Sequence, residues 1–294
     1  MTDRRKEALA LWAGQRLGVK DKIIAPASAD ASFRRYFRIE TEDASYILMD
    51  APPAQEDSAP FVRISALLCE WGLHAPEVLA SDMDRGFLLL SDLGSQTYLD
   101  ALQANESSAD RLYADAIAAL VSMQRHAQND ARCAALPPYG EKLLRDEMAL
   151  FCDWLLYRHL GIQLSDKDRK HWHQLQDVLV ASARAQPQIF VHRDYHSRNL
   201  MTAPPTPGIL DFQDAVIGPL TYDLVSLIKD CYVAWPAQKI DTWLQAYATL
   251  MAQAGLLSAA DEVSLAGWFN LMGVQRHLKA SGIFARLNHR LSLI

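Results

Sequence analysis

The chain of 294 residues is long enough for two lobes or one large domain, and half of its residues are hydrophobic. Its net charge of −6 argues against a nucleic-acid-binding protein, which normally presents a basic face. The four cysteines lack Cys-x-x-Cys spacing and so indicate neither a disulfide framework nor a zinc site. The sequence shows no secretory signal and no apolar run of about 20 residues. We therefore expect a cytoplasmic protein without a nucleic-acid or membrane partner.

The first part of the chain predicts a small β-rich lobe. Residues 4–17 have the periodicity of a short amphipathic helix. Alternating and apolar segments over residues 22–50 predict a hairpin, and residues 58–72 carry apolar side chains at helical spacing. Residues 76–94 read as two short strands joined by a turn at 84–86. The expected order is thus helix, strand, strand, helix, strand, strand.

The rest of the chain is mostly helical. Helical periodicity covers residues 108–127, 141–160, 166–185, 221–234, 238–255 and 260–287. Two short strands are expected in the middle, within residues 188–201 and 208–214, and they are joined by the proline-rich sequence TAPPTP. The sequence thus predicts an α+β fold with a small N-terminal lobe over residues 1–94 and a larger helical lobe over residues 95–294.

The segment FVHRDYHSRNLM, residues 190–201, concentrates polar side chains between apolar anchors. Asp194 and Asn199 are five positions apart, and Asp211 follows at the end of the strand GIL. Phosphoryl transfer from a nucleotide needs one carboxylate for the acceptor hydroxyl, and an amide and a second carboxylate for Mg²⁺. A His-x-Asp-x-x-x-x-Asn loop followed by a strand that ends in Asp supplies these groups. A polar surface loop is the alternative interpretation.

These motifs resemble the aminoglycoside phosphotransferase-like small-molecule kinases, which are relatives of the protein kinases. HRDYHSRN resembles their catalytic loop, and ILDFQDAVIGPLTYDL resembles their metal-binding segment. The resemblance implies a two-lobed protein-kinase-like fold that binds ATP and Mg²⁺. It implies that Asp194 is the catalytic base or orients the hydroxyl, and that Asn199 and Asp211 are Mg²⁺ ligands. His192 would support the loop, and Asp223 would either tie a helix start to that loop or act as an ordinary first-turn acid.

Several longer motifs narrow the resemblance to one bacterial branch of this family. They include SFRRYFRI, YILMDAPP, LLLSDLG, LRDEMALFCDWLL and QRHLKASGIFARL. The branch contains cell-wall-recycling kinases that phosphorylate the anomeric hydroxyl of N-acetylmuramate and N-acetylglucosamine. Kinases of aminoglycosides, choline or homoserine, or a nucleotide-binding relative without catalysis, are the alternatives.

The sequence departs from the family pattern at one position. The second strand of the family normally carries a phosphate-binding lysine, but Met49 or Asp50 falls there, and no lysine occurs between Lys22 and Lys142. The candidate replacements are the three arginines of the first hairpin, Arg34, Arg35 and Arg38. Arginine can take this role because its fork is always charged and bidentate.

Strand alternation places Arg34, Tyr36 and Arg38 on one face and Arg35 with Phe37 on the other. The small residues of the hairpin tip, including Ser32, would let backbone N–H groups approach phosphate. ATP is expected near the hinge LLSDLG, which contains Asp92. The alternative for the arginines is a solvated strand face.

The helical lobe should hold a small-molecule sugar acceptor. His196 and Arg198 flank Asp194, and Glu147 lies on a predicted helix. Arg276 and Lys279 are three apart on one helix face, where they can meet a substrate carboxylate or simply face solvent. The oligomeric state is open, with a monomer favoured.

Overall fold

The computed structural model describes residues 3–19, 23–28 and 33–291. The chain forms two compact units. Unit 1 comprises residues 1–101 and 199–214, and unit 2 comprises residues 102–198 and 215–294. The segment 199–214 therefore belongs to the first unit although it follows most of the second in sequence.

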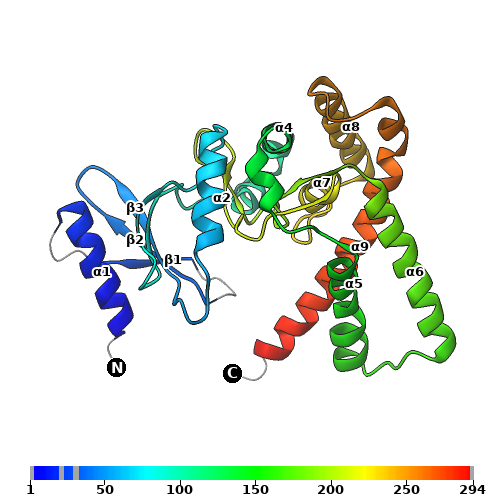
Figure 1. Cartoon of the computed structure of the whole chain (residues 1–294), viewed down its shortest axis with the longest axis horizontal. Helices are drawn as coiled ribbons and strands as arrows, with labels where there is room; N and C mark the ends of the chain where they lie inside the picture. The colour runs from blue at the N-terminus through cyan, green and yellow to red at the C-terminus, as the bar shows by residue number, and fades with distance from the viewer. Residues whose placement is uncertain (1–2, 20–22, 29–32, 292–294) are drawn as a thin grey trace. The chain divides into compact units, whose positions relative to one another are not determined.

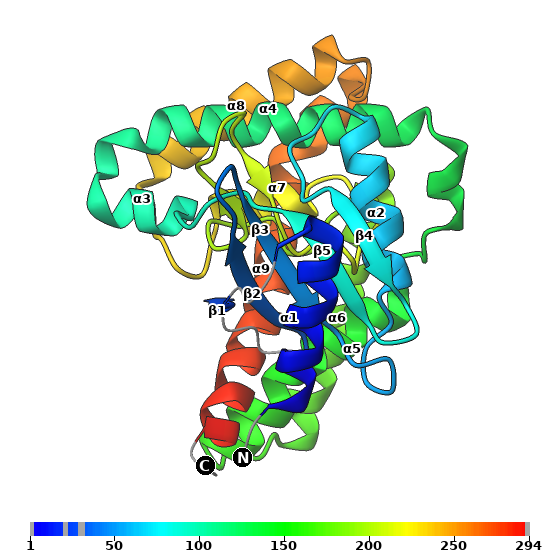
Figure 2. The ribbon, with the colours of Figure 1, turned by 90° about the vertical axis from the view of Figure 1, so that its left-hand side faces the viewer.

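Unit 1 is built on an antiparallel sheet of five strands in the order β1-β2-β3-β5-β4. Figure 1 labels β1, β2 and β3, and Figure 2 labels all five strands. The strands are β1 (Ala25–Ser28), β2 (Arg35–Glu40), β3 (Ser45–Asp50), β4 (Val78–Asp82) and β5 (Phe87–Ser91). Strands β2, β3 and β5 pair so that Arg35, Asp50 and Phe87 are neighbours across the sheet. Because side chains alternate along a strand, Phe37, Leu48 and Leu89 lie on this same face, and Tyr36, Met49 and Leu88 lie on the opposite face.

Helix α1 (Arg4–Leu17) covers the first of these faces. Its buried Leu9 and Trp12 pack in one cluster with Phe37, Leu48 and Leu89, and Figure 2 shows α1 in front of the sheet. Asp3 accepts a hydrogen bond from the Lys6 N–H, and the left-handed Gly18 ends the helix. The helix predicted for residues 4–17 is confirmed.

Three further elements complete unit 1. Helix α2 (Ala59–Glu70) has the predicted buried apolar face. The turn between β4 and β5 contains Gly86 with φ +71°, where a Cβ would lie 1.8 Å from the Ala51 carbonyl oxygen, so only glycine fits. Strands β7 (Leu200–Met201) and β8 (Gly208–Ile209) pair as a separate ladder. Helix α3 (Tyr98–Ala104), which the sequence did not predict, begins at the end of this unit.

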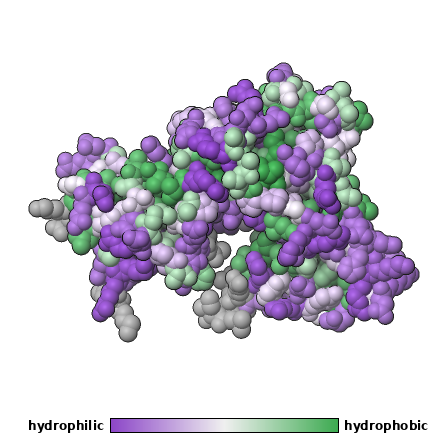
Figure 3. All heavy atoms as spheres, viewed as in Figure 1, coloured by the Kyte–Doolittle hydropathy of each residue, from purple (hydrophilic) through white to green (hydrophobic). Residues whose placement is uncertain are grey.

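Unit 2 is helical. Its helices are η1 (Glu106–Ser108), α4 (Ala109–Gln128), η2 (Ala131–Ala135), α5 (Glu141–Leu150), the π-helix η3 (Phe151–His159), α6 (Asp166–Ala185), α7 (Tyr222–Ile228), α8 (Ala237–Gln253) and α9 (Ala259–Leu291). The long α9 packs against α5, α6, α7 and η3. Most exposed side chains of α6 are hydrophilic, although Leu175 and Val178 are also exposed. Figure 3 shows how hydrophilic and hydrophobic residues are distributed over one face of the molecule. No described helix is both long and apolar enough to cross a bilayer.

The structure corrects three expectations for unit 2. Strand β6 (Gln188–Val191) pairs with an unpredicted strand, β9 (Val216–Pro219), so the strands around the loop form two separate pairs. Helix α7 ends at Ile228 rather than at 234, and the Asp230 carboxylate beyond its end accepts the backbone N–H of Ser197. The segment 141–160 changes from α- to π-helix after Leu150, where Gly282 of α9 comes so close that a Cβ would lie 2.3 Å from the Leu150 backbone.

Candidate active site

The candidate metal pair, Asn199 and Asp211, lies within unit 1. Asn199 precedes β7 and Asp211 follows shortly after β8, and the antiparallel pairing of these strands brings the two residues together. The Asn199 amide lies 3.1 Å from one carboxylate oxygen of Asp211, and Gln213 donates to the other oxygen at 2.7 Å. Asp211 has φ +63°, a conformation that costs free energy for a residue with a side chain and is often kept at functional sites.

This pair is chemically suited to Mg²⁺. Mg²⁺ takes oxygen ligands and usually binds one or two carboxylates together with phosphate oxygens and water. The amide and carboxylate of Asn199 and Asp211 supply such a donor set at contact distance. Among the described residues there is no cluster of three His, Cys, Asp or Glu side chains. The donor set thus resembles a site that shares its metal with phosphate groups rather than a closed metal cage.

Arg35 lies on the face of the sheet that α1 covers. Its guanidinium bonds the fully buried carboxylate of Asp50, at 3.1 Å from Nε, and also contacts Asp3. Arg5 of α1 bonds the same Asp50 carboxylate at 3.0 Å. Two guanidinium groups therefore neutralise Asp50, one of the residues at the position of the family's lysine.

Arg34 and Arg38 belong to the opposite face by alternation. Arg34 is only 9% exposed and forms an ion pair with Glu56 at 3.0 Å, and Glu56 also accepts from the Phe33 N–H at 3.2 Å. Glu56 lies just before α2, so this pair joins the hairpin to the start of that helix. Ser32, the predicted phosphate-binding residue of the hairpin tip, lies outside the described residues.

Arg38 is held at the hinge. It bonds the Asp92 carboxylate at 3.0 Å and the Gly94 carbonyl at 2.8 Å. Burial acts to raise the pKa of Asp92, but hydrogen bonds from Arg38 and Ser45 bring it below its ordinary value. Arg38 and Asp92, both predicted to bind nucleotide, therefore form one ion pair that fixes the hinge backbone.

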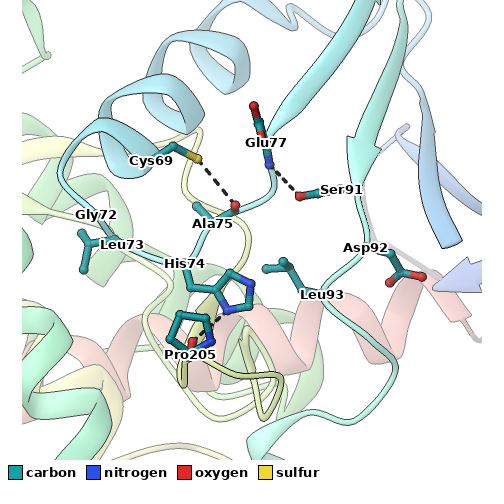
Figure 4. A pocket seen from close by; sticks show the side chains of 10 residues that line it. All are labelled: Cys69, Gly72, Leu73, His74, Ala75, Glu77, Ser91, Asp92, Leu93 and Pro205. Atoms are coloured by element: carbon teal, nitrogen blue, oxygen red, sulfur yellow. Dashed lines mark hydrogen bonds between the residues drawn. The ribbon is translucent and has the colours of Figure 1, made fainter. Parts of the chain in front are cut away.

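A recess of about 420 Å³ lies beside the hinge in unit 1 (Figure 4). Its lining includes Cys69, His74, Glu77, Ser91, Leu93 and Pro205. The imidazole of His74 bonds the Pro205 carbonyl at 2.8 Å, and the Asp92 side chain points away from this contact in Figure 4. Among the described residues no Lys or Arg lines the recess, so we do not expect a triphosphate there.

In unit 2 the catalytic loop is held by Asp223 at the start of α7. The Asp223 carboxylate accepts the backbone N–H groups of His192 at 2.6 Å and of Arg193 at 3.0 Å. The His192 imidazole accepts the Asp194 N–H at 3.2 Å, the local backbone contact that the sequence predicts. Arg193 has φ +78°, so the residue before Asp194 is conformationally constrained. Burial raises the pKa of Asp223 to about 7, although the two N–H groups act to lower it.

A buried group of charges lies next to this loop. Glu147 of α5 accepts from Arg193 at 2.8 Å and from Lys279 of α9 at 3.0 Å. Tyr139 donates to its second oxygen. Glu147, predicted as a substrate contact, is 6% exposed and serves here as the counter-ion of two cations. Burial acts to raise the pKa of Glu147, and Lys279, Tyr139 and Arg193 lower it below its ordinary value.

The other cations of this group influence Asp194. Arg276 and Lys279 are each 7% exposed, and both lie over the Tyr222 ring, at 5.4 and 5.6 Å from its centroid. Burial acts to raise the pKa of Asp194, but the positive charges of Lys279 and Arg276 bring it below its ordinary value. Asp194 is therefore held in its ionised form, as a hydroxyl-orienting group requires.

An aromatic surface next to the loop was not predicted. Tyr232 and Phe284, 38% and 43% exposed, meet edge to face at 6.0 Å. Arg198 lies over the Tyr232 ring at 5.0 Å, and His196 lies against it at 5.6 Å. These two aromatic residues are 52 positions apart in non-repeating contexts, so no local signal in the sequence could have joined them.

The structure therefore divides the predicted site residues between the units. Unit 1 brings together Asn199 with Asp211, and Arg38 with Asp92, and separates Arg35 from Arg34 on opposite faces of the hairpin. Unit 2 contains the predicted acceptor-side residues Asp194, His192, His196, Arg198, Asp223, Glu147, Arg276 and Lys279.

Comparisons with known proteins show the family of the chain. Residues 23–257 match the model of the phosphotransferase enzyme family. The N-acetylmuramate/N-acetylglucosamine kinase of Pseudomonas aeruginosa is 49% identical over 267 residues, which cover 91% of this chain and 77% of that protein. The kinase of the same name from Pseudomonas putida is 45% identical over 298 residues, covering 98% of this chain and 86% of that protein.

Solved structures share the fold. The GDP complex of wild-type aminoglycoside 2′-phosphotransferase-IIIa has a TM-score of 0.62 at 15% identity, covering 96% of this chain and 93% of that chain. Choline kinase from Streptococcus pneumoniae has a TM-score of 0.59 at 12% identity, covering 96% of each chain. The protein-kinase-like fold is confirmed. The chain belongs to the phosphotransferase enzyme family and is a kinase.

Proposed function

We propose that the protein is an ATP-dependent kinase that phosphorylates the anomeric hydroxyl of an N-acetylated amino sugar, N-acetylmuramate or N-acetylglucosamine. The observation that supports this acceptor class is the charge beside Asp194. Three buried or half-buried cations, Arg193, Arg276 and Lys279, lie there, and Glu147 is the bonded carboxylate of Arg193 and Lys279. A polycationic aminoglycoside or choline would be repelled by these charges, whereas a neutral or anionic sugar is compatible with them.

In the proposed reaction the C1 hydroxyl oxygen of the sugar attacks the γ-phosphorus of ATP. The bond from that phosphorus to the bridging oxygen breaks, ADP leaves, and the hydroxyl proton passes to Asp194. The ionised state of Asp194 suits it to orient the hydroxyl and accept its proton. The transition state is loose, so the protein contributes mainly by positioning the reactants and stabilising charge.

Asn199 and Asp211 would hold Mg²⁺, which neutralises charge on the transferred phosphoryl group when it is bound. We assign the role of the missing lysine to Arg34. It lies on the face of the hairpin away from α1, and its ion pair with Glu56, next to α2, resembles the strand–helix pair that the family's lysine makes. Arg35 is directed to α1 and Asp50, and Arg38 fixes the hinge.

The acceptor ring would stack on Tyr232, whose exposed face lies beside His196 and Arg198. The product, a sugar 1-phosphate, is the form that enters nucleotide-sugar synthesis, which places the enzyme in peptidoglycan recycling. Because it consumes ATP and this class of sugar, we place it in the cytoplasm.

One assay tests the function. The protein is incubated with Mg·ATP and, separately, N-acetylmuramate, N-acetylglucosamine, kanamycin and choline, while ADP release is followed. The product is then examined by ³¹P and ¹³C NMR. Phosphate on C1 of either sugar supports the proposal. Turnover of kanamycin or choline alone would overturn it, and nucleotide binding without turnover of any acceptor would indicate a non-catalytic relative.

The role of Asp194 is tested by Asp194→Ala. We expect turnover to fall about 100-fold or more, because a positioned base is lost. The control is Asp146→Ala, which removes an exposed carboxylate that pairs with Lys142 on the same helix, and should leave turnover unchanged. An Asp194→Ala enzyme that retains more than about a tenth of wild-type turnover would contradict the assigned role.

A further inference from the structure

The buried cations of α9 differ in how they are neutralised. Lys279 has a bonded carboxylate, Glu147, and also donates to the Tyr222 hydroxyl at 2.9 Å. Arg276 donates to the Ser226 hydroxyl of α7 and lies over the Tyr222 ring. Within the part of the chain that the structure describes, no carboxylate oxygen comes within 4.0 Å of the Arg276 guanidinium. Its positive charge is therefore not neutralised by direct contact with a described residue.

Burying the positive charge of Arg276 without a bonded carboxylate costs free energy. Guanidinium remains protonated even when buried, and its desolvation is offset only by a nearby anion or by hydrogen bonds. One bond to a hydroxyl and one aromatic face offset only part of that cost. Arg193 and Lys279 share the carboxylate of Glu147, whereas Asp194 and Asp223 influence Arg276 electrostatically without forming an ion-pair contact with it among the described residues. The Arg276 guanidinium can therefore still take an anionic ligand group in direct contact.

The position of Arg276 indicates which side of the reaction that anion belongs to. Arg276 contacts α7 through Tyr222 and Ser226, and the intervening Asp223 holds the backbone of the loop that carries Asp194. Arg276 is thus built into the same unit as the hydroxyl-orienting residue. Asn199, Asp211 and Arg34, which we assign to the nucleotide and its metal, belong to the other unit.

We propose that Arg276 binds the carboxylate of an acidic acceptor sugar and thereby sets the preference between acidic and neutral acceptors. This inference rests on the proposed function. N-acetylmuramate carries a lactyl carboxylate that N-acetylglucosamine lacks, and the planar guanidinium matches a carboxylate with two parallel hydrogen bonds. An enzyme that uses both sugars would gain affinity for the acidic one through this contact alone.

The two sugars form a matched pair for the test. Steady-state kcat and KM are measured for both with wild type, Arg276→Gln and Arg276→Lys. We expect Arg276→Gln to lower kcat/KM for N-acetylmuramate at least about tenfold, mainly through KM, with N-acetylglucosamine changed less than about threefold. Arg276→Lys keeps the charge without the fork and should lie between wild type and Arg276→Gln.

Controls separate this role from a structural one. Arg145→Gln removes a half-exposed arginine of the same unit that pairs with Glu141 and Asp177, and should affect both sugars equally and little. Binding of N-acetylmuramate without nucleotide, measured by calorimetry, should weaken in Arg276→Gln. An equal loss for both sugars, mainly in kcat, would assign Arg276 to the transferred phosphoryl group or to folding and overturn the inference. Wild-type turnover of neither sugar would overturn the proposed function as well.

Discussion

Each unit contains an aspartate with no exposed surface, Asp50 in unit 1 and Asp223 in unit 2. The two buried carboxylates are stabilised by different kinds of partner. Asp50 is bonded by the guanidinium groups of Arg5 and Arg35. Asp223 is bonded by two backbone N–H groups of the catalytic loop. In unit 1 the charge of Asp50 is neutralised by two cations. In unit 2 the carboxylate of Asp223 instead holds the backbone conformation of the loop.

The cations show the same difference. Arg34, Arg35 and Arg38 each face a carboxylate within unit 1. In unit 2, Arg193 and Lys279 share Glu147, and Arg276 has no such partner among the described residues. We infer that arginine pairing in unit 1 mainly fixes structure, with Arg34 as the exception. In unit 2 we infer that Arg276, which has no bonded carboxylate, serves the acceptor. The following predictions test each part of this difference.

The largest effect is expected at Glu147. Glu147→Gln leaves Arg193 and Lys279 without their shared carboxylate in a buried site, and we expect a loss of about 3–5 kcal/mol in the free energy of unfolding. The matched variant in unit 1, Glu56→Gln, leaves a single cation, Arg34, without its carboxylate and should cost less, about 1–3 kcal/mol. Urea denaturation followed by tryptophan fluorescence measures both. Equal losses in the free energy of unfolding would show that the ion pairs of Glu147 and Glu56 stabilise the two units to the same extent.

The raised pKa of Asp223 predicts that the free energy of unfolding depends on pH. Its folded pKa of about 7 lies above the unfolded value of about 3.9, so the folded state binds this proton more tightly. The resulting contribution to stability is fully present below about pH 4 and is lost as the pH rises through 7. Between these values Asp223 contributes a fall of up to about 1.4 kcal/mol per pH unit.

Asp223→Asn has no such titration. We expect the slope of the unfolding free energy between pH 4.5 and 6.5 to be more positive in Asp223→Asn than in wild type. The comparison uses slopes, so it holds even if the variant is less stable at every pH because an amide can accept only one of the two N–H groups. Parallel curves for the two proteins would show that Asp223 stays ionised throughout.

Arg34 and Arg35 test the two faces of the hairpin. Arg34→Ala should raise KM for ATP about tenfold or more, since a charged contact to phosphate is lost. Arg35→Ala should leave KM for ATP within about twofold, because Arg35 is directed to Asp50 and Asp3 on the α1 face. Steady-state kinetics at saturating acceptor measure both. If Arg35→Ala raised KM for ATP more than Arg34→Ala did, Arg35 would be the phosphate-binding arginine and Arg34 the structural one.

Much of this arrangement follows from local signals in the sequence. Helix α1 was predicted to the residue from its amphipathic period. In the structure Asp3 and Gly18 cap its two ends. Alternation alone separated Arg34 from Arg35. The loop motif predicted Asp194, Asn199 and Asp211 as a set, and the structure brings Asn199 and Asp211 together.

Long-range contacts were not predictable in this way. Strand β9 reads VIGP, too short and too rich in Gly and Pro to indicate a strand, and only its pairing with the distant β6 makes it one. Glu147 lies 132 positions from Lys279, so its role as a shared counter-ion depends on the packing of α5 against α9. Tyr232 and Phe284 meet for the same kind of reason.

We expect the smallest effect on the free energy of unfolding when one of the two arginines that pair with Asp50 is removed. Arg35→Ala removes one of its two guanidinium partners, but Arg5 still bonds the carboxylate, and both arginine side chains are 39% exposed. We expect a loss of only about 1 kcal/mol in the free energy of unfolding, the usual value for a partly exposed pair. Arg85→Ala, which removes an exposed pair with Asp82 in the same unit, serves as the reference and should cost less. A loss of about 3 kcal/mol or more in Arg35→Ala would mean that Arg5 cannot neutralise Asp50 alone. The stability contribution of Asp50 would then depend on each single partner residue, as it does for the buried acids of unit 2.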